Sequence, residues 1–186
     1  MTRFWFVRHG PTGAKGLIGS TDLPADLSDR PALDRLGSAL PDAPVISSTL
    51  ERARMTAAAL GRERLTDDPA LCEMHYGDWE GKDFAAIAAG WPDLSRAFWE
   101  DPGTHAAPGG ESWNAMSARV ADWIDGFDGN EVIVVTHMGP IMAAIAHALG
   151  LMPKQATAFV IAPLSITRLD RLPGGLWRIG SINHVA

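Results

Sequence analysis

Short apolar segments alternate along the chain with segments in which apolar residues recur every three or four positions. The apolar segments predict strands at residues 2–7, 44–47 and 131–136. Helical spacing predicts helices at residues 30–40, 48–61, 82–90 and 111–127. The first strand contains four consecutive large apolar residues, which is typical of a strand buried on both faces of a sheet. This alternation of strands and helices predicts a layered α/β fold.

The last third of the chain has a different pattern. Residues 159–172 and 176–182 alternate polar and apolar side chains with a period of two, on either side of Pro173, Gly174 and Gly175. Such a pattern around a turn predicts an antiparallel hairpin. No linker or internal repeat divides the 186 residues. We therefore expect one domain over residues 1–186, a three-layer α/β sandwich whose central sheet is mostly parallel, with helices on both faces and an antiparallel edge hairpin.

One segment, residues 132–152, contains no Asp, Glu, Lys or Arg and is long enough to cross a membrane. Its pattern argues against that. It begins with four β-branched residues, and Pro140 follows at a position that suits the first turn of a helix. We expect a strand followed by a buried helix. At the helix expected over 48–61, Ser48 and Glu51 have the spacing of a capping box.

The composition limits the classes of partner. The net charge of −6 argues against a general nucleic-acid or membrane-surface binder, although it permits a local basic pocket. Cys72 is the only cysteine, which excludes an internal disulfide and fits a reducing compartment. The first residues do not resemble a signal peptide. We expect a cytoplasmic protein with a small-molecule partner, and its oligomeric state stays open.

Polar residues follow each of the three predicted parallel strands. Arg8 and His9 follow the first, Arg52 lies in the first turn of the helix after the second, and His137 follows the third. Open parallel sheets place ligands beyond the carboxyl ends of their strands, so these side chains are expected to converge. Guanidinium groups match phosphate oxygens bidentately, and helix N-termini favour anions. The sequence therefore predicts a pocket for a phosphoryl group.

Five motifs, FVRHGPT, SSTLERARMTA, LCEMHYGDWEG, PGGES and VVTHMGPI, occur in an order that resembles the histidine phosphatase superfamily, also called the phosphoglycerate mutase-like family. The resemblance implies that His9 is the nucleophile that becomes phosphorylated. It also implies that Arg8, Arg52 and His137 hold the phosphoryl oxygens and that Glu73 donates a proton to the leaving oxygen. Residues 17–24, LIGSTDLP, look most like the α-ribazole phosphatase branch.

Other residues of these motifs are candidates for binding the phosphate or the rest of the substrate. Thr12 and Met138 are such candidates by their place in FVRHGPT and VVTHMGPI. Two positions depart from the family pattern: Pro11 replaces a residue that is usually acidic, and Lys15 replaces a common asparagine. Lys15 fits either a second anionic group of the substrate or the solvent-exposed surface. These departures bear on the substrate more than on the chemistry.

Several side chains near these motifs have two interpretations. Arg54 fits a solvated helix residue. Glu111 and Ser112 lie at the start of the predicted helix, where capping explains them as well as a ligand contact does. We expect a lid over the site near three tryptophans, which fit either the core or stacking on a substrate ring: Trp91, Trp99 and Trp113.

The resemblance implies a metal-independent phosphatase, without a cofactor, that hydrolyses small-molecule phosphomonoesters through a phosphohistidine. Mutases of the family carry additional sequence over the site, whereas only 21 positions separate Arg52 from Glu73 here. Phosphoglycerate mutase-type transfer and a noncatalytic phospholigand-binding protein are the alternatives. A metal-dependent hydrolase is a third alternative, but the chain contains no HExxH or HxH spacing of metal ligands. The chain also lacks a Walker loop, the glycine-rich motif that binds nucleotide phosphates.

Overall fold

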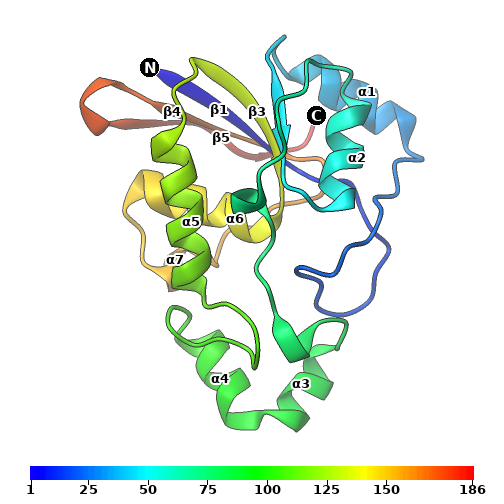
Figure 1. The fold of residues 1–186 in the computed structure, drawn as a ribbon, viewed down its shortest axis with the longest axis vertical. Coiled ribbons are helices and arrows are strands. Elements are labelled where there is room, and N and C mark those ends of the chain that lie inside the picture. Colours follow the sequence, from blue (N-terminus) through cyan, green and yellow to red (C-terminus); the bar gives the residue numbers. More distant parts are fainter.

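The computed structural model describes all 186 residues and contains one five-stranded sheet in the order β2-β3-β1-β4-β5. Its strands are β1 (Thr2–Arg8), β2 (Val45–Ser47), β3 (Glu131–Thr136), β4 (Ile166–Arg171) and β5 (Trp177–His184). β2, β3 and β1 are parallel, whereas β4 and β5 run antiparallel to their neighbours. The sheet is therefore mixed, with the predicted antiparallel hairpin at one edge (Figure 1).

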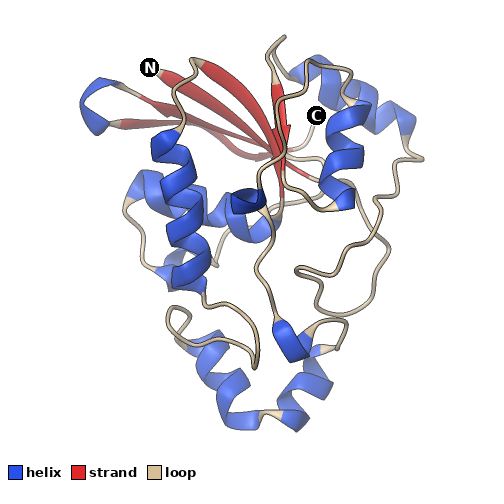
Figure 2. Cartoon of the chain, in the orientation of Figure 1, coloured by secondary structure: helices blue, strands red, loops and turns tan.

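Helices cover both faces of the sheet (Figure 2). On one face, Phe4, Phe6 and Val134 pack with residues of α5 (Trp113–Gly126) and α6 (Met138–Leu149). On the other, Val7, Ile133 and Val135 pack with residues of α1 (Arg30–Ala39) and α2 (Glu51–Ala59). Neighbouring residues of a strand point to opposite faces, so one apolar strand supplies both layers. The three-layer sandwich is confirmed.

A smaller lobe extends beyond the carboxyl ends of the parallel strands (Figure 1). It contains α3 (Phe84–Gly90) and α4 (Pro92–Glu100), and it follows two 3₁₀ turns, η1 (Pro69–Leu71) and η2 (Gly77–Trp79). Trp79 is fully buried, and its ring centroid lies 5.1 Å from that of Phe98 in an edge-to-face arrangement. Aromatic packing thus holds this lobe together in the absence of a sheet. The sequence pattern did not predict α4.

Three local predictions were wrong. The capping box is absent, because α2 begins at Glu51 with Leu50 at its N-cap, and the Ser48 hydroxyl bonds to His137 instead. The helix predicted from residue 111 begins at Trp113, because the Ser112 side chain caps it by accepting a bond from Ala115 N. The strand predicted over residues 159–172 is limited to β4, since Leu164 adopts a positive φ of 59° before it.

The remaining short elements are α7 (Pro153–Ala156), after α6, and η3 (Pro173–Gly175), which forms the turn of the β4–β5 hairpin. The apolar segment of residues 132–152 contains most of β3 and all of α6, and most side chains of both elements are buried. Every helix is too short or too polar for a membrane span.

Candidate active site

The carboxyl ends of the parallel strands meet at one pocket. Arg8 pairs with Thr136 and Ser47 pairs with Val135, so the three strands end at nearly the same level. A cavity of about 220 Å³ lies there. Six of the residues named from the sequence line it: Arg8, His9, Thr12, Arg52, Glu73 and Met138. His137 lies directly beside it, with its ring centroid 4.9 Å from that of His9.

The hydrogen bonds of His9 fix its tautomer. Nδ1 lies 2.6 Å from the carbonyl oxygen of Gly10. A carbonyl oxygen only accepts hydrogen bonds, so Nδ1 carries the proton and Nε2 is unprotonated. The lone pair of Nε2 accepts a hydrogen bond from Nε of Arg52 at 3.3 Å. The ring thus presents an unprotonated nitrogen to the guanidinium that lines the pocket.

His137 is held on both sides of its ring. Its Nδ1 accepts a hydrogen bond from Nε of Arg52 at 3.2 Å, and its Nε2 lies 2.7 Å from the hydroxyl of Ser48. The residue is completely buried, whereas His9 keeps 7% of its surface exposed. His9 is therefore the more accessible of the two imidazoles. Ser48, at the end of β2, was missed from the sequence because it was assigned to a helix cap.

Both histidines are neutral at neutral pH. Burial lowers the pKa of His9 to about 3; the hydrogen bond to Gly10 opposes this effect, and the positive charges of Arg52 and Arg8 add to it. Burial likewise lowers the pKa of His137 well below its ordinary value, with His9 and the arginines adding to the effect. A neutral imidazole retains the lone pair that a nucleophile needs.

The two arginines retain N–H groups for an anion. Nη1 and Nη2 of Arg52 donate to the carbonyls of Thr21, at 2.9 Å, and Gly19, at 2.5 Å. Each terminal nitrogen carries two hydrogens, so one N–H on each is left. Nη1 of Arg8 donates to Ile161 O, but its buried Nε has no partner within the protein. A buried charged donor without a partner is costly, and an anionic ligand would satisfy it.

Glu80 holds the loop that positions Arg52. Its carboxylate accepts hydrogen bonds from the backbone N–H groups of Gly19, Ser20 and Thr21 and from the Thr21 hydroxyl. Burial disfavours its ionised form, yet these bonds outweigh that cost and keep the pKa of Glu80 below its ordinary value. The carbonyls of this same loop receive the Arg52 guanidinium. Glu80 was not predicted as a site residue, although it belongs to the motif LCEMHYGDWEG.

Glu73 is a buried carboxyl group at the wall of the pocket. Its Oε1 and Oε2 accept hydrogen bonds from the backbone of Met74, at 2.9 Å, and Gly139, at 3.2 Å. Burial raises the pKa of Glu73 above its ordinary value, against these bonds and the charges of Arg52 and Arg8. A carboxyl group with a raised pKa keeps its proton to a higher pH than an ordinary carboxyl group does, and it can release that proton to a reacting oxygen.

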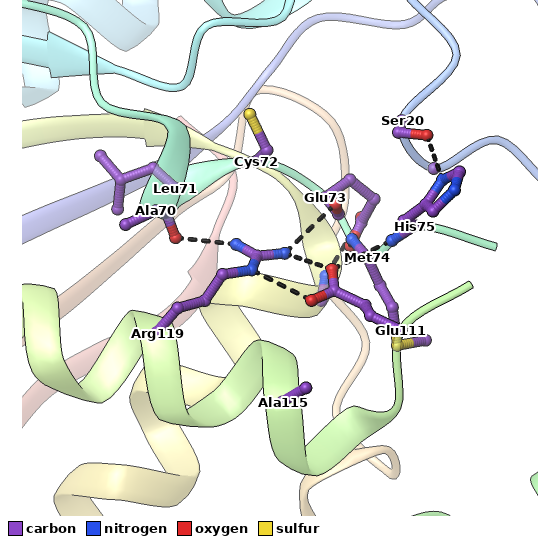
Figure 3. A network of polar contacts seen from close by, with 12 residues as sticks. Ser20, Ala70, Leu71, Cys72, Glu73, Met74, His75, Glu111, Ala115 and Arg119 are labelled. Atoms are coloured by element: carbon purple, nitrogen blue, oxygen red, sulfur yellow. Dashed lines mark hydrogen bonds and ion pairs between the residues drawn. The ribbon is translucent and has the colours of Figure 1, made fainter. Parts of the chain in front are cut away.

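The backbone around Glu73 is tied to α5 by an ion pair (Figure 3). Arg119 forms two bonds with the Glu111 carboxylate and donates to the carbonyls of Ala70, at 2.8 Å, and Glu73, at 3.3 Å. Glu111 in turn accepts from the backbone N–H of His75 at 3.0 Å. Glu111 therefore has a structural role beside the pocket, and Ser112 is a helix cap. Arg119 was missed because nothing in its local pattern distinguishes it.

The remaining residues named from the sequence differ in whether they line the pocket. Thr12 and Met138 are part of its wall, but Lys15 is exposed and outside it. Arg54 is exposed and pairs with Asp67, in agreement with the solvated interpretation. The structure contains no group of three or more His, Cys, Asp or Glu side chains that could hold a metal ion. The positive charge at the pocket comes from Arg8 and Arg52.

Two neutral imidazoles, two arginines and a buried carboxyl group lie together at the carboxyl edge of an α/β sheet, and such a set of groups can bind and transfer a phosphoryl group. Comparison with known proteins gives the family. The model of the histidine phosphatase superfamily (branch 1) matches residues 4–184, and the chain belongs to this superfamily.

Three relatives illustrate the similarity. A bifunctional protein of Mycobacterium tuberculosis is 38% identical over 114 residues, which cover 58% of this chain and only 31% of that protein. Adenosylcobalamin/alpha-ribazole phosphatase of Salmonella typhimurium is 33% identical over 162 residues, which cover 79% of each chain. The solved structure of mycobacterial glucosyl-3-phosphoglycerate phosphatase has a TM-score of 0.82 and 30% identity, with all of both chains covered.

Proposed function

We propose that this protein hydrolyses small-molecule phosphomonoesters through a phosphohistidine formed on His9. Membership of the histidine phosphatase superfamily and its phosphatase relatives support a phosphoric monoester hydrolase. The observation that carries the proposal is the hydrogen bond from His9 Nδ1 to the carbonyl of Gly10, which leaves Nε2 unprotonated in the pocket. A lowered pKa keeps that nitrogen unprotonated.

In the first step, Nε2 of His9 attacks phosphorus while the bond to the leaving oxygen breaks. The remaining N–H groups of Arg8 and Arg52 hold the phosphoryl oxygens and balance their charge. His137 accepts a hydrogen bond from Nε of Arg52 and so helps to position that guanidinium for the phosphoryl oxygens. Glu73 donates its proton to the leaving oxygen, which departs as an alcohol.

In the second step, a water molecule attacks the phosphorus of phosphorylated His9. The ionised Glu73 accepts a proton from that water, and the P–N bond breaks. Free phosphate leaves, His9 regains its lone pair, and Glu73 is again protonated. The fixed hydrogen bonds of Met74 and Gly139 keep the Glu73 carboxylate in place through both steps.

Hydrolysis of p-nitrophenyl phosphate is the first test. We expect turnover that survives EDTA, is inhibited by vanadate and falls by at least a thousandfold in His9→Ala. Loss of activity on chelation, restored by zinc or magnesium, would favour a metal-dependent hydrolase. Phosphate binding without turnover would favour a noncatalytic phospholigand-binding protein.

A second assay separates the phosphatase from a mutase. The protein is incubated with 3-phosphoglycerate and a trace of 2,3-bisphosphoglycerate, and both 2-phosphoglycerate and free phosphate are followed. We expect any product to be free phosphate, because only 21 positions separate Arg52 from Glu73 and little additional chain is present to shield the phosphohistidine. Interconversion of the monophosphates much faster than phosphate release would establish a mutase instead.

A further inference from the structure

A second cavity adjoins the phosphoryl pocket. It has a volume of about 300 Å³ and lies among the small lobe, the start of α5 and the start of α6. Tyr76 and Met138 line both this cavity and the phosphoryl pocket. The side chains that dominate its wall are aromatic or thioether groups: Met74, Phe98, Trp99, Trp113, Met138 and Met142. None of its lining residues is charged. We refer to this cavity as the apolar chamber.

The position of Glu73 relates the apolar chamber to the chemistry. The two backbone N–H groups that bind the Glu73 carboxylate belong to Met74 and Gly139, and both of these residues line the chamber. The oxygen that Glu73 protonates therefore lies at the mouth of the chamber. That oxygen carries the organic part of the substrate, so this part has the chamber directly beside it.

Gly139 lies where the start of α6 approaches the Glu73 carboxylate, and this position has no room for a larger residue. A Cβ atom at Gly139 would collide with the Glu73 carboxylate and press on Met116. Glycine thus permits the close approach between the start of α6 and the acid. Met138, next to it, is 36% exposed and has a flexible side chain, so it can adapt to a group that passes from one cavity to the other.

We propose that the apolar chamber binds the organic part of the substrate and that the preferred substrates are phosphomonoesters of alcohols with an aromatic or bulky apolar group. This inference rests on the proposed phosphatase function. Aromatic and methionine side chains stabilise an aromatic ring through burial and edge or face contacts. A polyol or a second phosphate group would lose hydration in the chamber without gaining a charged partner.

The chamber also resolves the interpretations of the three tryptophans near the lobe. Trp113 is 5% exposed and forms part of the core as well as the chamber wall. Trp99 is 45% exposed and lines the chamber, so it is available to stack on a bound ring. Trp91 packs 6.3 Å from Trp79 and lines neither cavity. Trp99 and Trp91 therefore form a matched pair for substitution.

The test compares 2-phenylethyl phosphate, ethyl phosphate and glucose 6-phosphate, all esters of primary alcohols. We expect kcat/KM for the phenylethyl ester to exceed that for the ethyl ester by about tenfold to a hundredfold, as burial of one aromatic group allows. Trp99→Ala should reduce this preference at least fivefold. Thr157→Phe, which places a ring in the chamber from an exposed position of the wall, should reduce it as well. Trp91→Ala should keep it.

Equal kcat/KM for the phenylethyl and ethyl esters, or a preference for glucose 6-phosphate, would overturn the chamber proposal. So would a preference that Trp99→Ala and Trp91→Ala reduce equally. Binding of 3-phenylpropylphosphonate and propylphosphonate by calorimetry separates this outcome from failure of the proposed function. Tighter binding of the phenyl compound, lost in Thr157→Phe, supports the chamber even if no ester is hydrolysed. Equal binding of both phosphonates contradicts it.

Discussion

The buried state of His9 predicts a measurable dependence of stability on pH. Its pKa is about 3 in the folded protein, against an ordinary value of 6.5 that applies to the unfolded chain. Between these values the unfolded chain binds a proton that the folded protein does not, so stability falls as the pH decreases below 6.5. At pH 4.5 the difference is two pH units from 6.5, or roughly 2.7 kcal/mol of lost stability from this one group.

The perturbation that isolates this effect is His9→Asn, which removes the titrating group. The free energy of unfolding is measured by urea titration at pH 7.5 and pH 4.5 for the wild type, for His9→Asn and for His184→Asn. His184 is an exposed histidine in β5 and serves as the control. We expect His9→Asn to lose roughly 2 to 3 kcal/mol less than the wild type on acidification. We expect His184→Asn to follow the wild type.

The same acid-induced loss in His9→Asn and in the wild type, within about 0.5 kcal/mol, would refute the reasoning. It would show that His9 titrates near its ordinary value in the folded protein. The imidazole would then be protonated over much of the acidic range, and the argument for a permanently available Nε2 would fail.

Three further predictions concern the residues around the reacting atoms. Glu73→Gln should reduce kcat/KM for ethyl phosphate by about a hundredfold to ten-thousandfold but affect p-nitrophenyl phosphate far less. The wild-type rate should decrease as the pH rises through the raised pKa of Glu73, and this decrease should be absent in Glu73→Gln; pH–rate profiles with both substrates check both expectations. Arg119→Met should lower kcat for ethyl phosphate roughly tenfold with little change in KM, because Arg119 acts by positioning Glu73. In a double-mutant cycle, the Arg119→Met/Glu73→Gln enzyme should discriminate between ethyl phosphate and p-nitrophenyl phosphate to the same extent as Glu73→Gln alone. Equal losses on both substrates would show a merely structural role. Glu80→Gln should weaken competitive inhibition by inorganic phosphate roughly tenfold, since the loop that holds Arg52 loses its ionised acceptor; unchanged inhibition would contradict this positioning.

The convergence of the site could be predicted from sequence because it follows from strand order and direction. Arg8 and His137 come at the ends of apolar segments, and parallel strands bring such ends to the same edge of the sheet. The edge hairpin could be predicted as well, because its two strands keep a period of two around a Pro-Gly-Gly turn. These are properties of local pattern combined with general rules of sheet topology.

The hydrogen bonds that hold the site residues in place could not be predicted from the sequence. Glu80 bonds a loop about sixty positions earlier in the chain, and Arg119 bonds the carbonyl of Glu73 from 46 positions away. No local periodicity encodes such pairs. Ser48 shows the competition directly: its local spacing to Glu51 favours a helix cap, yet its hydroxyl lies 2.7 Å from a buried histidine nitrogen that has no other hydroxyl partner. The buried imidazole takes the Ser48 hydroxyl, while the backbone N–H of Glu51 donates to the Asp22 carboxylate instead.

The small lobe shows a third limit of sequence patterns. α4 begins with Trp91 at its N-cap and Pro92 at its first position, and it ends after only nine residues. Its buried aromatic side chain, Phe98, contacts Trp79 of another segment rather than a sheet face. The apolar chamber exists only because these segments meet α5 and α6, so it could be found only in the three-dimensional structure.

The central claim is that His9 carries the phosphoryl group during turnover. Rapid quenching of the enzyme with ³²P-labelled substrate tests it directly, followed by proteolysis and location of the labelled residue. We predict an adduct on His9 that is labile in acid and stable in alkali, that forms within one turnover and that is absent in His9→Ala. Active wild-type enzyme that shows no labelled protein within a turnover, or that carries the label on His137 or another residue, would contradict the account.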